Sequence, residues 1–494
     1  MDVLHWLSQN HELATKGFIP GIIPTVFIPL TALTVALTSL ASLVAGWFGI
    51  KLHTEGPKQF LEVLLKKRVL ISMMIMNLLG WGIYKSYIYI DTLPSFIYTI
   101  EHYSNKNAHP SYEVYPDSRF RKHNYDNNIT SSPISSLKLI NETKISKGAF
   151  RSGVISGNSI FYGSDDGKIY EFDKKSLAIK RAFFIGTQVT TRPIIYKNRL
   201  FAGEGNHSTH HARIYSFNLS TGKFINAFNT AGHTEGQPLI ENFQDKEVMF
   251  ITGGNDGLYA LDPMTMKELW HRKDGHLDAT VSVQNGIIYS GTGVEKGTVR
   301  DRSYAIAYEF QTGKTIWKKE LPLSNWMHPV ITEKDVCFAL GEIYVKSSIG
   351  LLHCLDKKSG NPHFSIPFDA PLTSKPLYLK KQDQEFIFLA DINGNACGVN
   401  LNLKEKMWCH STSQTPISNS MTSFEYAPQS GLLWYPSFNN GLFAIEPESG
   451  KILSHWVPSS TQSKWNENYA SISVDGSNLY QMDIDGNLRM FQVN

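Results

Sequence analysis

The stretch Gly253–Trp270, GGNDGLYALDPMTMKELW, contains two short runs that alternate apolar and polar residues, Leu258–Leu261 and Lys267–Trp270. A tight turn at Asp262–Met266 separates the two runs, and the sequence Asn-Asp-Gly stands before the first. Alternation over four residues bounded by glycine, asparagine and aspartate is typical of β-strands. We therefore interpret the stretch as two antiparallel strands joined by a short turn.

The same phrase recurs along the chain. When the copies are aligned on the last residue of the first strand, the steps between neighbours are 45, 44, 47, 47, 44 and 46 residues. The aligned residues are Asp173, Asn218, Asp262, Glu309, Asp356, Asn400 and Glu446. An eighth copy, LRMFQ, places Gln492 at the same position, 46 residues after Glu446. A period near 45 residues with several short strands per unit predicts an all-β, eight-bladed β-propeller of four-stranded blades.

The eighth blade needs a strand from elsewhere in the chain. Its first three strands are expected at residues 470–474, 479–483 and 487–493, and the sequence then ends. The segment SLKLINETKI, residues 136–145, alternates well and precedes the first blade. Pairing this segment with the eighth blade would remove an exposed sheet edge, so we predict that it closes the ring.

A bulky aromatic residue recurs four positions after the turn between the third and fourth strands. The residues concerned are Trp270, Trp317, Phe364 and Trp408. Glycine in several of these turns supplies the positive φ angle that a tight hairpin needs. We expect the aromatic residues to dock one blade on the next rather than to bind a ligand.

Composition is uneven along the 494 residues, because the first hundred are far more apolar than the rest. The net charge is only +3, which is not the strongly basic balance of a nucleic-acid-binding protein. No nucleic-acid partner is therefore expected.

Two apolar runs near the N-terminus predict a membrane anchor. Residues 17–50 contain no charged side chain, and a second run covers residues 69–90 with Lys85 as its one charged residue. The spans are expected at about 25–50 and 69–90, because crossing a bilayer takes about 20 apolar residues. The loop between them carries five lysine or arginine residues against two glutamates. By the positive-inside rule this loop is cytoplasmic. The alternative, a cleaved signal peptide, fits poorly, because the N-terminal region is not basic and a second apolar run follows.

These features divide the chain into an anchor at residues 1–100, a polar linker at 101–135 and a propeller at 136–494. The expected location is the inner (cytoplasmic) membrane, with the propeller on the periplasmic side.

Four cysteines lie in the fifth and sixth blades. Cys337 with Cys354, and Cys397 with Cys409, could face one another on neighbouring strands. Disulfides form where the compartment is oxidising. Disulfide pairs and buried free thiols both remain open from the sequence.

The phrases GSDDGKIYEFD (163–173), GGNDGLYALD (253–262) and TGKTIW (312–317) resemble the PQQ-like β-propeller repeat, and this resemblance covers residues 136–494. The family includes quinoprotein dehydrogenases and BamB-like outer-membrane assembly scaffolds. The dehydrogenase branch implies a bound quinone, a calcium ion, a catalytic aspartate and a pair of adjacent cysteines. The scaffold branch implies a non-catalytic platform that binds other envelope proteins.

One face of the propeller is the expected binding surface. In a four-stranded blade, the loops between the second and third strands and the connections between blades emerge on the same face; we call it the loop face. Residues at the start of each innermost strand would form a ring there: Arg151, Arg192, Gln237, Ala279, His328, Lys375, Asn419 and Ala470. Three cations, one histidine and no carboxylate predict a basic rim that attracts an anionic ligand or a partner protein. The alternative is a channel lined only by polar side chains and water.

The segment Asn206–Arg213, NHSTHHAR, is the most unusual local sequence. His207, His210 and His211, with Glu204 or His233 nearby, could bind zinc through imidazole nitrogens. A histidine-rich loop can equally be an ordinary polar surface.

The choice between enzyme and scaffold rests on missing groups. The chain has no adjacent cysteines, no carboxylate at the aligned rim positions, and no G-x-S-x-G or phosphate-binding glycine motif. We therefore expect no PQQ and no calcium, and a scaffold rather than a dehydrogenase or a metal-dependent enzyme. BamB is an outer-membrane lipoprotein, whereas this chain has no N-terminal cysteine and a predicted inner-membrane anchor, so only the general scaffold role carries over.

Overall fold

The computed structural model describes residues 123–124, 137–186, 188–205, 212–294, 302–343, 349–413, 420–458 and 468–493. They belong to one compact unit, Pro94–Asn494. The predicted membrane spans and nearly all of the predicted linker lie outside the described residues. Within the described ranges, no helix is long and apolar enough to cross a membrane.

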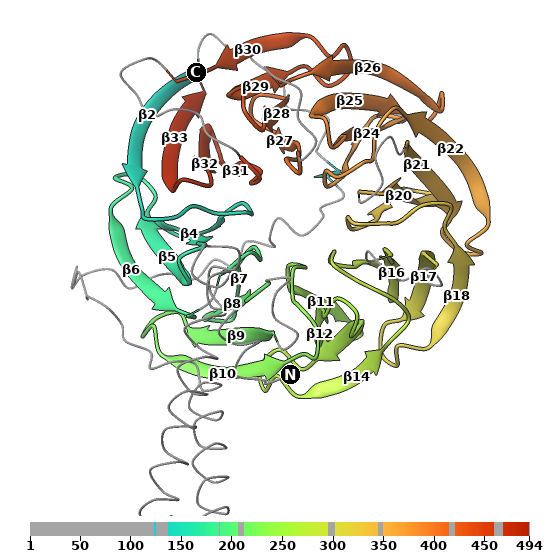
Figure 1. Cartoon of the computed structure of the whole chain (residues 1–494), viewed down its shortest axis with the longest axis horizontal. Coiled ribbons are helices and arrows are strands. Elements are labelled where there is room, and N and C mark those ends of the chain that lie inside the picture. The colour runs from blue at the N-terminus through green and yellow to red at the C-terminus, as the bar shows by residue number, and fades with distance from the viewer. Residues whose placement is uncertain are drawn as a thin grey trace, which may run out of the picture. The chain divides into compact units, whose positions relative to one another are not determined.

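Seven consecutive blades each contain four antiparallel strands in chain order, which run from the centre of the ring to its outer edge (Figure 1). Blade one consists of β3 (Val154–Ser156), β4 (Ser159–Gly163), β5 (Lys168–Asp173) and β6 (Ile179–Phe184). Blade two consists of β7 (Ile194–Tyr196), β8 (Arg199–Gly203), β9 (Arg213–Asn218) and β10 (Phe224–Asn229). Blade three consists of β11 (Leu239–Phe243), β12 (Lys246–Thr252), β13 (Leu258–Leu261) and β14 (Glu268–Arg272). Blades four and five are β15 (Ser282–Gln284), β16 (Ile287–Gly291), β17 (Tyr304–Glu309), β18 (Thr315–Glu320); and β19 (Val330–Ile331), β20 (Asp335–Gly341), β21 (Gly350–Asp356), β22 (Pro362–Phe368). Blades six and seven are β23 (Leu377–Lys381), β24 (Gln384–Ala390), β25 (Asn395–Asn400), β26 (Glu405–Ser411); and β27 (Glu425–Ala427), β28 (Leu432–Pro436), β29 (Leu442–Ile445), β30 (Ile452–Trp456).

The eighth blade joins the two ends of the propeller. It consists of β31 (Ser473–Asp475), β32 (Asn478–Met482), β33 (Asn487–Val493) and, as its outermost strand, β2 (Leu137–Lys144). In Figure 1, β2 lies beside β33 at the outer edge of the ring. The eight-bladed ring and its closure by the segment before blade one are therefore confirmed, with the closing strand one residue shorter at each end than predicted.

One short strand falls within the predicted linker. β1 (His123–Asn124) pairs in parallel with β23, the innermost strand of blade six. Blade six thus has a fifth strand on its inner side.

The three recurrent tryptophans pack on the glycine turn of the next blade, as expected, and Phe364 packs against the core cluster between blades five and six. Trp270 contacts the turn at Gly313, Trp317 the turn at Gly360, and Trp408 the turn at Gly450. A Cβ atom on any of these three glycines, all at positive φ, would lie within 2.6 Å of the indole ring. Each indole Nε1 also donates a hydrogen bond to a carbonyl oxygen of the neighbouring blade, over 2.9–3.2 Å. These contacts hold successive blades in one register.

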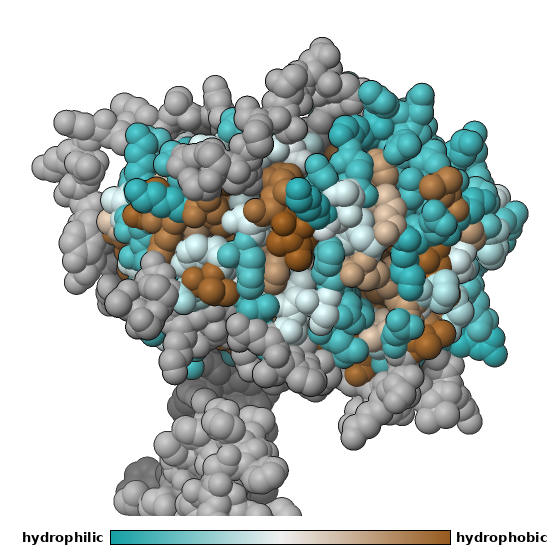
Figure 2. Space-filling view, turned by 90° about the horizontal axis from the view of Figure 1, so that it is seen from above, coloured by the Kyte–Doolittle hydropathy of each residue, from teal (hydrophilic) through white to brown (hydrophobic). Residues whose placement is uncertain are grey.

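The hydrophobic core is divided among the interfaces between blades. One cluster joins the first and eighth blades through side chains that include Ile160, Phe172, Tyr480 and Leu488. Similar clusters fill the other interfaces. The outer wall shows hydrophobic side chains scattered among hydrophilic ones (Figure 2), which is ordinary for a folded surface.

The loop face is tied together by short β-bridges between blades. Gly254, in the loop between β12 and β13, pairs with Leu277, in the connection to blade four. His276 pairs in turn with Gly293, in the loop after β16. Loops and connections therefore do share one face, and their backbones are fixed by hydrogen bonds.

Both cysteine pairs form disulfides. Cys337 of β20 is bonded to Cys354 of β21, and Cys397 of β25 to Cys409 of β26. In each case the two residues are direct partners in the antiparallel ladder. The structure thus selects the disulfide over the free-thiol alternative.

Candidate functional site

A cavity of about 140 Å³ lies among the starts of the innermost strands on the loop face. Its charged lining residues are Arg151, Arg192, Glu235, Asp278, Lys375 and Glu425. Its apolar lining residues are Trp326, Met327, Ile343, Met421 and Tyr469. We call this feature the central cavity.

The predicted rim residues converge on this cavity. Arg151, Arg192, Gln237, His328 and Lys375 line it, and Ala279 lines it as well. Ala470 is fully buried between the lining residues Tyr469 and Ser471. Asn419 lies outside the described residues. The alignment of strand starts therefore locates the cavity, whereas binding at these residues is still a prediction.

The expectation of a basic rim without carboxylates was wrong. Glu235, Asp278 and Glu425 also line the cavity and balance its three cations. The Lys375 ammonium lies 3.8 Å from a carboxylate oxygen of Glu425. The sequence alignment missed the three acids because Glu235 and Asp278 precede the aligned positions by one or two residues, and Glu425 lies inside β27.

The arginines are held in place rather than projecting freely. The guanidinium of Arg192 donates from Nε and Nη2 to the carbonyl oxygen of Gly153, over 3.2 and 3.1 Å. Burial lowers the pKa of Arg151, and the negative charges of Glu235 and Asp278 partly offset this effect. Arg192 thus ties the start of blade two to the start of blade one.

His328 does not add to the positive charge. Burial, assisted by the nearby positive charge of Lys375, lowers the pKa of this imidazole well below its usual value. A neutral imidazole is therefore favoured at neutral pH. The central cavity carries mixed and nearly balanced charge.

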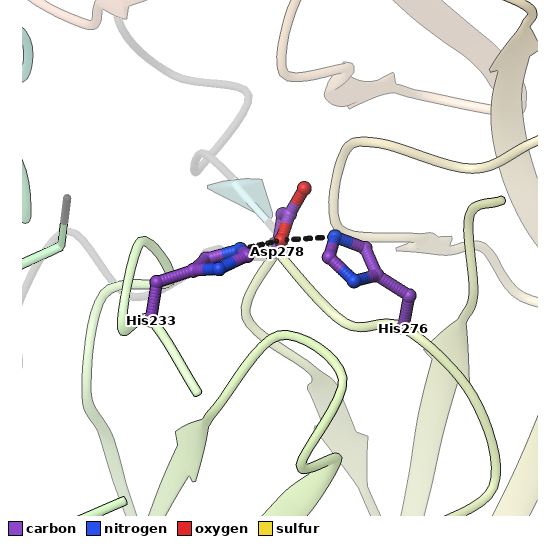
Figure 3. Close-up of side chains that lie close together, drawn as sticks. All are labelled: His233, His276 and Asp278. Atoms are coloured by element: carbon purple, nitrogen blue, oxygen red, sulfur yellow. Dashed lines mark hydrogen bonds and ion pairs between the residues drawn. The ribbon is translucent and has the colours of Figure 1, made fainter. Parts of the chain in front are cut away.

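A second group of side chains lies beside the cavity, in the connections that lead into blades three and four. His233 and His276 point at the same carboxylate, that of Asp278 (Figure 3). The Asp278 Oδ1 atom lies 2.6 Å from His233 Nε2 and 2.7 Å from His276 Nε2. Both histidines are 6% exposed. We call these three residues the His-His-Asp cluster.

The electrostatics of the cluster favour an ionised carboxylate. Burial alone would raise the pKa of Asp278, but hydrogen bonds and positive charge from His233 and His276 lower it overall. Asp278 therefore carries negative charge across the physiological pH range.

A repeated four-residue pattern in the sequence marks the two connections that form the cluster. Gly232–Glu235 reads Gly-His-Thr-Glu, and the corresponding connection one blade later, 275–278, reads Gly-His-Leu-Asp. The two histidines occupy the same place in connections one blade apart, but a pattern of this length does not show that one carboxylate reaches both rings.

The predicted zinc loop is not tested. His207, His210 and His211 lie outside the described residues. Of the two residues expected to assist them, Glu204 is 2% exposed and accepts a 2.5 Å hydrogen bond from the Tyr215 hydroxyl. His233, the other, belongs to the His-His-Asp cluster.

Comparisons with known proteins agree on the fold. A family model described as outer membrane protein assembly factor BamB matches residues 301–493. Among solved structures, BamB from Moraxella catarrhalis is 12% identical, with a TM-score of 0.53 over 72% of this chain and 100% of that one. Quinohemoprotein alcohol dehydrogenase from Comamonas testosteroni is 11% identical, with a TM-score of 0.53 over 72% of this chain and 76% of that one. The computationally designed protein Ika8 is 11% identical, with a TM-score of 0.51 over 71% of this chain and 98% of that one.

A search of curated proteins finds no match. At such low identities the structural likeness establishes the propeller fold alone. The family match supports a BamB-like, PQQ-like repeat in the second half of the propeller.

The central cavity, as the described residues line it, is small for the quinone that the dehydrogenase branch implies. Sites for small molecules and cofactors typically enclose about 300–1,000 Å³, and the central cavity has about 140 Å³. The four cysteines form cross-strand disulfides, so none is available for an adjacent pair.

Proposed function

We propose that this protein is a non-catalytic interaction scaffold that binds other envelope proteins through the loop face, with the central cavity as the anchoring point. The proposal includes the predicted inner-membrane anchor, which would hold the propeller on the periplasmic side.

The observation that carries the proposal is the composition of the central cavity. Aromatic residues, methionine and arginine are enriched at protein interfaces, and tryptophan, tyrosine and arginine dominate their binding energy. The cavity combines Trp326 and Tyr469 with Met327, Met421 and the two arginines. Trp326 is held rigidly, because its Nε1 donates a 2.8 Å hydrogen bond to the carbonyl oxygen of Gly341.

Paired charges around this apolar part would favour specificity over general attraction. A partner side chain that enters the cavity would have to match both signs of charge, because Arg151, Arg192 and Lys375 face three carboxylates. Complementary charges mainly select the partner and increase the association rate. A mixed rim therefore supports a protein partner better than a simple anion.

The two disulfides support the proposed location. Stable disulfides are typical of oxidising compartments such as the periplasm and are rare in the cytosol. The disulfides and the positive-inside asymmetry of the N-terminal loop are independent features that favour the same side of the membrane.

The test is site-specific photo-crosslinking of the full-length protein in cells. A photoreactive residue would replace Met327, which is half-buried in the cavity, or Ile316, which is 47% exposed on the outer strand β18. We expect a discrete crosslinked partner from position 327 and none from position 316. Reversing two cavity charges, with Arg192→Glu and Lys375→Glu, should abolish the crosslink at position 327 while the propeller still folds.

An equal crosslink from both positions, or a crosslink that survives the double charge reversal, would refute docking at the central cavity. The expected absence of PQQ and calcium is checked on the same preparation by mass spectrometry of the bound small molecules and metals. Bound PQQ would replace the scaffold with a quinoprotein enzyme as the favoured function.

A further inference from the structure

We propose that His233, His276 and Asp278 form a binding site for a divalent transition-metal ion beside the central cavity. The proposal does not depend on the scaffold role. It shares only His233, a possible helper there, with the zinc site predicted at His207, His210 and His211.

The three side chains have the chemistry and the spacing of a metal site. Their candidate ligand atoms, one per residue, all lie within 4.8 Å of one another. Imidazole nitrogen suits zinc, copper, iron and nickel, whereas calcium and magnesium prefer oxygen ligands. Two imidazoles and one carboxylate therefore favour a first-row transition metal, with zinc as the metal to test first.

Each ring nitrogen of His276 faces an oxygen atom. The Nδ1 atom of His276 lies 2.8 Å from the amide oxygen of Asn255, which can only accept a hydrogen bond. If Nδ1 donates to that oxygen, Nε2 is the ring atom left for a metal ion, and it faces the Asp278 carboxylate 2.7 Å away. A metal ion satisfies both histidines and the carboxylate at once.

The surroundings fix the ligands before any metal arrives. His276 Nδ1 has the amide oxygen of Asn255 as its partner, and a metal-bound histidine usually has such a partner on its second ring nitrogen. The segment between His276 and Asp278 is fixed by two hydrogen bonds between Leu277 and Gly254, each of 3.0 Å. Such support lowers the cost of assembling the site.

Position 254 must be glycine because the His233 ring lies against it. Gly254 has a φ of +53°, and a Cβ atom there would lie 2.6 Å from Cε1 of His233. The backbone therefore leaves space for the imidazole on this side of the cluster. On the other side, the Trp326 ring packs edge-on to His276, with a centroid separation of 6.0 Å.

The proposed ion would be accessible from the central cavity. Asp278 belongs to both the cluster and the lining of the cavity. Three protein ligands leave at least one coordination position open in a tetrahedral site. A water molecule or a donor group of a ligand in the cavity could complete the coordination.

The experiment measures metal binding by the tag-free full-length protein after chelation and removal of the chelator. Zinc binding is followed by isothermal titration calorimetry, and Co²⁺ binding by its visible absorption. We expect one ion per chain. His276→Gln should lower zinc affinity at least about 100-fold, and Asn255→Ala should lower it about 10–100-fold through loss of ligand orientation. His363→Gln, at an exposed site beside Asp335, is the matched control and should leave affinity unchanged.

A triple variant, His207→Ala with His210→Ala and His211→Ala, separates this site from the histidine loop. Loss of the ion in the triple variant with retention in His276→Gln would overturn the proposal. So would the absence of stoichiometric binding by the wild type. If His276→Gln does not fold, zinc K-edge absorption of the wild type decides: two imidazoles with an oxygen ligand support the site, and three imidazoles contradict it.

Discussion

Leu137, at the start of the closing strand β2, lies directly opposite Val493 in β33, so the propeller is sealed by residues from opposite ends of its sequence. The pairing runs on to Lys144 opposite Asn487, with one irregularity between Leu139 and Asn141. The closing strand thus covers the edge of β33 and becomes the outermost strand of the eighth blade.

The closing strand should be essential for stability, and one of its faces should matter more than the other. Leu139 is half-buried against the interface of blades seven and eight, whereas Ile140 is 43% exposed. Leu139→Asp should destabilise the propeller by about 2 kcal/mol or more, because it places a charge against apolar side chains. Ile140→Asp should cost less than about 0.5 kcal/mol.

Thermal unfolding of both variants and of a deletion of residues 136–145 measures the effect. The deletion should lower the melting temperature more than either substitution, since it exposes the edge of β33. A melting temperature unchanged by the deletion would refute the role of closure.

A buried arginine should contribute more to stability than an exposed one. Arg489 is fully buried, and its Nη1 lies 2.9 Å from the equally buried Asp483 carboxylate, while its Nε lies 2.9 Å from Glu142 of the closing strand. Arg489→Met should cost about 3–5 kcal/mol, because Asp483 would lose its buried counter-charge.

Arg302 provides the control, because it forms an ion pair with Glu320 in which the two side chains are 65% and 53% exposed, respectively. Arg302→Met should cost clearly less than Arg489→Met, because solvent screens an exposed ion pair. Denaturant unfolding compares the two variants, and equal losses would contradict the assignment of Arg489 to a buried network.

The disulfides should each add to stability in the oxidised protein. They close segments with sequence separations of 17 and 12 residues. Loops of about this length correspond to about 3 kcal/mol in the chain-entropy account. Replacing Cys337 and Cys354 by serine, or Cys397 and Cys409, should therefore lower the melting temperature of the oxidised protein.

Reductant should destabilise the wild type, whereas a variant without all four cysteines should not respond. Alkylation of thiols in intact cells, followed by mass spectrometry, checks the pairing. Four reactive thiols in the native protein would contradict both the disulfides and the proposed periplasmic location.

Asp165 should make stability fall as the pH rises. This residue lies in the turn after β4. Burial raises the pKa of its carboxyl to about 6, and the negative charge of Asp166 adds a smaller upward effect. The positive charge of Lys147 partly offsets the rise. The folded protein then holds this proton more tightly than the unfolded chain. The resulting stabilisation is fully present below about pH 4 and is lost as the pH rises to about 6.

Asp165→Asn removes this titration. Between pH 4 and pH 7, the free energy of unfolding of the wild type should fall by about 1–2 kcal/mol more than that of the variant. This figure is smaller than the full pKa shift would give, because the side chain is partly exposed to solvent. Unfolding free energies at several pH values measure the difference. Parallel pH profiles for the two proteins would contradict a raised pKa.

The difference between the basic rim expected and the mixed rim found has a physical cause. The alignment of strand starts located Arg151, Arg192 and Lys375 because a propeller repeats its backbone from blade to blade. Glu235 and Asp278 lie in connections before those strands. The path of such a connection depends on the neighbouring blade, which the sequence pattern does not describe.

The sequence alone determined the eight blades, the closing strand and the aromatic docking residues, because each depends on local periodicity and turn chemistry repeated many times. The pairing of the cysteines was narrowed to two partner sets, since strand register limits which residues can face one another. Only the tertiary structure decided that both pairs are disulfides and that His233, His276 and Asp278 meet. Two connections bring those three side chains together, and their approach is fixed by hydrogen bonds between blades, which the linear pattern does not encode.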